Sequence, residues 1–197
     1  MGKREALFGN SESARHDVDS ALARAPGRDV KLTAAFALAV TGDLARAKVL
    51  VEQLEKAETA NSVLKLNILP TIRAQIEISQ GHPSQALREL EAAVPYDLGN
   101  SPLGNLYPAY VRGQAYLAAH NGSAATGEFQ KLIDHPGIVM LEPTGALAHL
   151  QLGRSYVLAS DAIKAKAAYQ DFLKLWKDAD PDIPILKQAK AEYAKLQ

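Results

Sequence analysis

An alanine followed four residues later by an apolar side chain recurs five times along this chain, each time shortly after a turn. The alanines lie 33 to 40 residues apart, at Ala14, Ala47, Ala86, Ala125 and Ala165. Self-similarity at such a period indicates stacked supersecondary units that bury their apolar faces on one another. A spacing of four residues places both side chains on one face of a helix. We therefore expect an all-helical chain built from stacked units, with no strand.

Helix-start signals stand in front of these alanines. Asn10, Asp43, Asn121 and Asp161 have side chains that accept a backbone N–H at a helix N-cap. Pro83 suits the first helical position, where its missing N–H costs nothing. These residues predict that each alanine lies in the first turns of its helix.

Each of these helices should pair with a helix that precedes it. The expected partner helices cover residues 29–41, about 60–79, 105–120 and 142–159. Pro70 should kink the second of them or mark its true first turn. Turn-forming residues predict a long loop at 94–105. The short apolar run at 138–141 is interpreted as a buried connector.

One stretch, residues 147–172, contains both helices of a unit in full. Small residues at its helix crossing should let the two backbones approach, and aromatic side chains should fill the space beside them. The order is Leu152-Gly153, Tyr156, Ala165, Tyr169 and Phe172. This spacing resembles the tetratricopeptide repeat, whose period is about 34 residues.

The tetratricopeptide resemblance covers nearly the whole chain and is strongest over 109–172. It implies a right-handed α-α superhelix, a single solenoid over residues 1–197 with about four and a half helix pairs and a capping helix at 183–197. The chain departs from the family at His149, where Trp is usual, and at Arg73 and Arg112, where Leu is usual.

Residues 175–197 and 107–117 are similar to parts of the repeat region of bacterial eukaryotic-type serine/threonine kinases. A related group places similar repeats behind a winged-helix DNA-binding domain. Both resemblances imply a non-catalytic partner-binding or sensing module within a longer protein. The alternative is a structural spacer or a self-association domain.

Catalytic and cofactor motifs are absent from the sequence. The chain has no cysteine, no phosphate-binding glycine loop, no kinase signature and no histidine pair that could clamp a metal from one helix face. Lys plus Arg and Asp plus Glu number 22 each, which does not favour nucleic acid or a membrane surface. We expect no enzymatic activity, no cofactor and no metal, and a cytoplasmic protein whose partner is a protein or peptide segment.

The first helices of stacked pairs line the inner groove of such a solenoid. With Gly113 and Gly153 at the close crossings, this rule predicts a groove that is aromatic and amide-rich. The candidate partner-binding residues are Gln75, Tyr107, Tyr110, Gln114, Leu150, Gln151 and Arg154. The alternative is that Tyr107 and Tyr110 pack on the 94–105 loop. The groove lacks the Lys, Arg and Asn pattern of a carboxylate clamp.

The two ends of the chain differ. Residues 183–197 form an amphipathic pattern with lysines opposite the apolar face, as a capping helix should. Before Ala14 only residues 5–8 suggest a helix, too little to be stable in isolation. We therefore expect the chain to be a fragment of a longer protein, with self-association through its N-terminal end as a further option.

Overall fold

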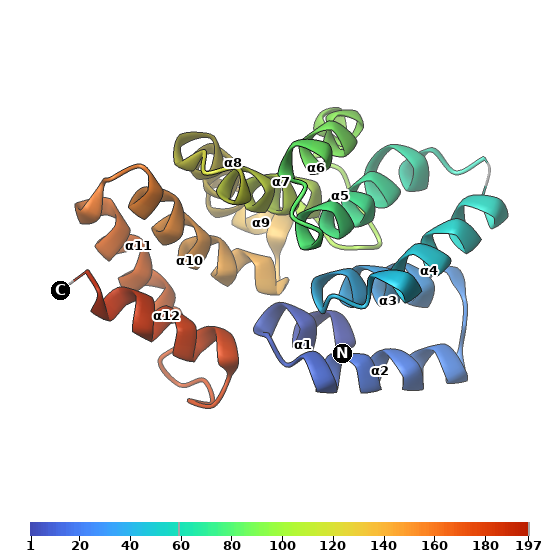
Figure 1. Ribbon diagram of the computed structural model, residues 1–197, viewed down its shortest axis with the longest axis horizontal. Helices are drawn as coiled ribbons and strands as arrows, with labels where there is room; N and C mark the ends of the chain where they lie inside the picture. The colour runs from blue at the N-terminus through green and yellow to red at the C-terminus, as the bar shows by residue number, and fades with distance from the viewer. Residues whose placement is uncertain (59, 197) are drawn as a thin grey trace.

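The structure, a computed structural model, describes residues 1–58 and 60–196. Within these ranges all regular elements are helical and none is a strand, as the sequence predicted. Helix pairs follow one another around an arc (Figure 1). The all-helical α-α solenoid is therefore confirmed.

The arc is built from paired helices, with the first helix of each pair on its inner side. The pairs are α1 (Gly2–Phe8) with α2 (Ser11–Arg24), α3 (Arg28–Val40) with α4 (Leu44–Ala57), α5 (Leu69–Ser79) with α6 (Pro83–Leu90), α7 (Tyr107–Ala118) with α8 (Gly122–Asp134), and α10 (Pro143–Leu158) with α11 (Ala162–Leu175). α12 (Pro184–Ala194) follows them. Shorter elements are the π-helix η1 (Leu64–Ile68), the 3₁₀ helix η2 (Glu91–Tyr96) and α9 (Pro136–Val139).

Small residues lie at the helix crossings. The five recurring alanines, at positions 14, 47, 86, 125 and 165, are all fully buried. A Cβ atom on Gly113 would lie 2.6 Å from the Phe129 ring, and one on Gly153 would lie 2.8 Å from the Tyr169 ring. Each aromatic ring therefore fills the space that its facing glycine leaves open.

The predicted N-caps divide into two groups. The side chains of Asn121 and Asp161 each accept the backbone N–H of the third residue on, at 3.1 Å. Asn10 and Asp43 stand at the same position in α2 and α4 without making that bond. Instead, the Asn10 side-chain amide donates to the Glu5 carboxylate at 2.8 Å.

The predicted helix over about 60–79 is divided in the structure. Pro70 lies in the first turn of α5, and η1 leads directly into that turn. Pro70 therefore marks a helix start, one of the two outcomes that its position allowed. Residue 59 lies outside the described ranges.

The interpretation of 138–141 as a buried connector was wrong. Residues 136–139 form the short helix α9, and only Val139 of the run is buried. Met140 has a positive φ of 55°, which reverses the chain between α9 and α10. Met140 and Leu141 are consequently 72% and 99% exposed.

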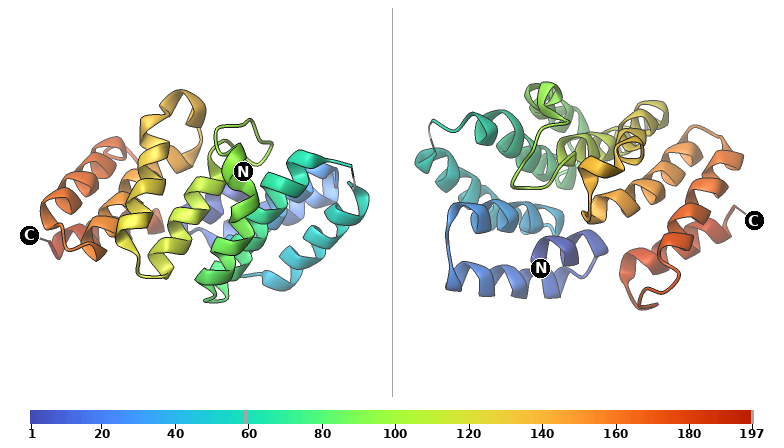
Figure 2. Two further views of the ribbon diagram at one scale, coloured as in Figure 1. Left: turned by 90° about the horizontal axis from the view of Figure 1, so that it is seen from above. Right: turned by 180° about the vertical axis from the view of Figure 1, so that it is seen from behind.

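The two ends of the arc meet. α1 packs against α2 and α3 and also touches α12, so the arc closes on itself (Figures 1 and 2). Ala6 and Leu7 are buried although α1 has seven residues. A helix this short is stable through tertiary packing, which the sequence argument about an isolated helix did not include.

Candidate functional site

A pocket of about 630 Å³ opens on the inner side of the arc, between its two ends. Four of the seven predicted groove residues line it: Tyr110 and Gln114 from α7, and Gln151 and Arg154 from α10. The rest of the wall comes from the end of α3, from α1, and from α12 with the residues before it: Val40, Ala6, Leu7, Gly9, Asp182, Pro184, Ile185, Lys187 and Gln188.

Arg154 is held in place from the α12 side of the pocket. Its guanidinium donates two hydrogen bonds to the Glu192 carboxylate, both at 2.9 Å, and a third to the Gln188 amide oxygen at 3.2 Å. Burial alone would lower the pKa of Arg154, but the hydrogen bond and charge of Glu192 raise it overall. The pocket therefore presents a fixed cation whose charge is largely balanced by Glu192.

The pocket wall also contains three uncharged polar side chains, those of Tyr110, Gln114 and Gln151. The Tyr110 hydroxyl accepts a long hydrogen bond, 3.4 Å, from the Gln151 side-chain amide. Burial raises the pKa of Tyr110 to about 12, so the hydroxyl stays protonated at neutral pH. The Gln114 amide oxygen is buried without a hydrogen-bond partner. Tyr110 and Gln151 are buried whereas Gln114 is partly exposed, so Gln114 is the neutral polar side chain that the backbone of a bound segment can reach.

The other three predicted residues do not line this pocket. Leu150 is a fully buried core residue, and Gln75 is buried, with its amide 3.4 Å from the Ser79 hydroxyl. Tyr107 is fully buried, and its ring lies against Gly104, as the alternative of packing on the 94–105 loop expected. Its hydroxyl donates to the Glu142 carboxylate at 2.9 Å.

The residues of α1 and α12 that complete the pocket wall were not among the predicted groove residues. Helical periodicity identifies the inner face of each helix pair, but it does not reveal that the first and last helices of the arc touch. The amphipathic pattern at 183–197 was the available signal, since it required that α12 cover another element.

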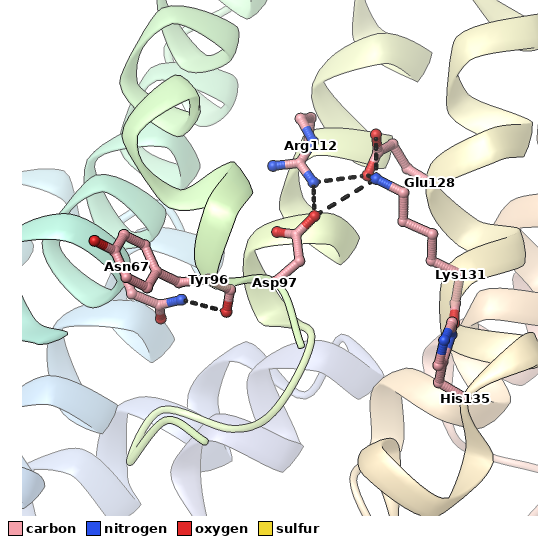
Figure 3. Close-up of polar contacts among 7 residues, drawn as sticks. All are labelled: Asn67, Tyr96, Asp97, Arg112, Glu128, Lys131 and His135. Atoms are coloured by element: carbon pink, nitrogen blue, oxygen red, sulfur yellow. Dashed lines mark hydrogen bonds and ion pairs between the residues drawn. The ribbon is translucent and has the colours of Figure 1, made fainter. Parts of the chain in front are cut away.

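A buried charge cluster lies outside the pocket and fixes the 94–105 loop to α7 and α8 (Figure 3). Arg112 binds the Asp97 carboxylate, and it donates to the Glu128 carboxylate at 2.9 Å. Lys131 lies 3.0 Å from Glu128 at the exposed edge. Burial alone would lower the pKa of Arg112, but its hydrogen bond to Glu128 and the two carboxylate charges raise it. Arg112 stands at a position where the tetratricopeptide family usually has Leu. Its burial there is explained by its ion pairs with Asp97 and Glu128.

The chain is similar to a known repeat-containing protein. The chain is 34% identical over 136 residues to a tetratricopeptide repeat and J domain-containing co-chaperone of Fusarium oxysporum f. sp. lycopersici. The match covers 69% of this chain and 23% of that protein, so the chain spans about a quarter of its relative. The similarity supports a tetratricopeptide-like helical repeat. No family model matches the chain, and no solved structure matches it.

Two kinds of feature are absent from the described residues, a membrane-spanning helix and a cluster of metal ligands. No helix there has the length and apolar character that crossing a membrane would require. Nor do three or more His, Asp or Glu side chains gather there in a group that could hold a metal ion.

Proposed function

We propose that this chain is a non-catalytic protein–protein interaction module that binds a peptide segment in its inner pocket. The main support is that four of the predicted groove residues, Tyr110, Gln114, Gln151 and Arg154, line one cavity of about 630 Å³. The tetratricopeptide-containing co-chaperone is a relative whose repeats fit the same role.

The chemistry of the pocket favours an extended segment that presents its backbone. The partly exposed Gln114 side chain can pair with peptide N–H and C=O groups, whereas Gln151 is buried and accepts a hydrogen bond from Arg154 at 3.3 Å. Because Glu192 balances Arg154, binding should depend only modestly on salt concentration.

Peptides selected from a random 12-residue phage library on the wild-type protein provide the test. Tyr110→Phe keeps the buried ring, and Arg154→Gln keeps polarity at the wall, so both should fold. We expect their combination to weaken a selected peptide at least tenfold, because it removes the Arg154 guanidinium and the Tyr110 hydroxyl from the pocket wall. Val49→Glu on the exposed face of α4 is the matched control, and its affinity should equal that of wild type. Equal affinity for all variants would place binding elsewhere.

A more specific hypothesis makes this module the regulatory or sensing part of a bacterial serine/threonine kinase. It rests on the resemblance of residues 175–197 and 107–117 alone, and the relative found here carries a J domain instead. In the alternative, the neighbouring domain of the same protein is a winged-helix DNA-binding domain. The reading frame that surrounds this region of the gene distinguishes these options, because each requires a different neighbouring domain.

Self-association is a second candidate function, favoured by exposed apolar side chains beside an apolar hollow. A cavity of about 580 Å³ is lined by Phe8, Trp176 and their neighbours, and Met140, Leu141 and Leu175 stand exposed at its rim. A projecting side chain next to a hollow can make a patch self-complementary, because the projecting side chain of each copy can enter the hollow of the other. Patches of this kind mark interaction sites on soluble proteins.

Leu141→Glu should therefore abolish dimers if this face joins two copies. The added charge would be buried at the interface without a partner. Ile163→Glu is the matched control, since Ile163 is 84% exposed and does not line the hollow. Sedimentation velocity of the three proteins over a concentration series measures the effect. A wild type that stays monomeric throughout would exclude this candidate.

A further inference from the structure

The ammonium group of Lys3 is held by groups from the loop before α7, from the start of α7 and from the start of α10. Its Nζ donates to the Leu103 carbonyl at 2.6 Å and to the Glu142 carboxylate at 3.0 Å. The same atom lies 4.4 Å from the centre of the Tyr107 ring, a cation–π distance. α1 is therefore tied to residues about 100 and 139 positions further along the chain.

The Leu103 carbonyl, the Glu142 carboxylate and the Tyr107 ring form a socket for the Lys3 ammonium, and these groups are themselves held in place. Tyr107 and Lys3 both donate to one Glu142 oxygen, at 2.9 and 3.0 Å. Burial, followed by the charge of Glu142, raises the pKa of Tyr107, so its hydroxyl remains a donor. Gly104, with φ +132°, lets the Tyr107 ring lie where any Cβ atom would be 2.3 Å away. The ring is thus fixed beneath the Lys3 ammonium.

A second contact joins the C-terminal end of α1 to the far end of the arc. The Phe8 and Trp176 rings meet edge to face, with centroids 4.8 Å apart. Gly9, with φ +87°, follows directly, and a Cβ on it would lie 3.0 Å from the Pro184 ring. The chain thus turns away from α1 in contact with the start of α12.

We propose that α1 is a clasp that closes the arc and so forms the inner pocket. The clasp consists of Lys3 in its socket and Phe8 on Trp176. The pocket takes part of its wall from α1 and part from α12, so separating these helices would remove it. The contact between α1 and α12 is less extensive than the packing within any helix pair. It can therefore open without unfolding the pairs. The link from closure to peptide binding rests on the function proposed above.

Spin labels on the full chain measure the closure directly. The chain contains no native cysteine, so Ser13→Cys in α2 and Lys190→Cys in α12 give two unique labelling sites on exposed positions. Double electron–electron resonance then reports the distance between the ends of the arc. The variants are Lys3→Met with Phe8→Ala, the milder Glu142→Gln, and the control Lys48→Met on the exposed face of α4.

We expect a single short distance in wild type and control, and a longer, broader distribution in the double variant with its helix content retained. An unchanged distribution in the double variant would overturn the clasp. If the double variant loses its helix signal, the test rests on Glu142→Gln. A distance distribution of Glu142→Gln without a component longer than in wild type would then overturn the clasp. The selected 12-residue peptide should bind the opened variant at least tenfold more weakly. Longer distances with unchanged peptide affinity would support the clasp but place the peptide site outside this pocket.

Discussion

Replacing Arg112 by Met should lower the free energy of unfolding by about 3–5 kcal/mol, the usual cost of removing one partner from a buried ion pair. The side chains of Asp97 and Glu128 are 9% and 13% exposed, so both carboxylates would lose their main counter-charge in a site with little water. Lys131 approaches them from the exposed edge and replaces only part of that charge. Urea denaturation measures the loss.

Two further variants separate charge from packing in this cluster. The combination of Arg112→Met with Asp97→Asn and Glu128→Gln should recover most of the lost stability, since it leaves no unpaired buried charge. Lys131→Met, at the 40% exposed edge of the cluster, should cost about 1 kcal/mol or less. An Arg112→Met protein as stable as wild type would show that the cluster contributes little to anchoring the 94–105 loop.

Replacing Gly122 by Ala should destabilise the protein by roughly 1–3 kcal/mol, although Ala favours helices more than Gly does. A Cβ on Gly122 would lie 2.6 Å from the Ser155 carbonyl oxygen and 2.9 Å from the Ala159 backbone nitrogen. Both are backbone atoms of the α10 end and cannot rotate away. The substitution must therefore push α8 away from α10.

Gly127 provides the matched control in the same helix. It is exposed, and no atom lies within 4 Å of the place where its Cβ would stand. Gly127→Ala should therefore stabilise the protein by up to about 1 kcal/mol. Denaturant midpoints that move in the same direction for Gly122→Ala and Gly127→Ala would contradict the close crossing of α8 and α10.

The repeat architecture could be predicted from the sequence because it depends on local spacing. The alanine at each helix crossing and the glycines that face Phe129 and Tyr169 lie within one helix pair, where sequence distance and spatial distance agree. The start of α5 at Pro70 and the caps at Asn121 and Asp161 are likewise properties of single turns.

The features that could not be predicted join distant parts of the chain. Tyr107 was assigned to an open groove, yet Lys3, about 100 residues earlier, covers its ring. Arg112 departs from the repeat pattern because Asp97, in a loop with no helical period, lies beside it. Met140 turns outward through a positive φ that an apolar run does not reveal. Each depends on how tightly the arc curves or on one backbone turn.

Photo-crosslinking shows whether a peptide segment binds in the inner pocket. The photoreactive residue p-benzoylphenylalanine would replace Gln188, on the pocket wall, or Lys48, on the exposed face of α4. With the selected 12-residue peptide bound, we predict crosslinking from position 188 and none from position 48. Crosslinking from position 48, or none from 188 at saturating peptide, would contradict binding in this pocket.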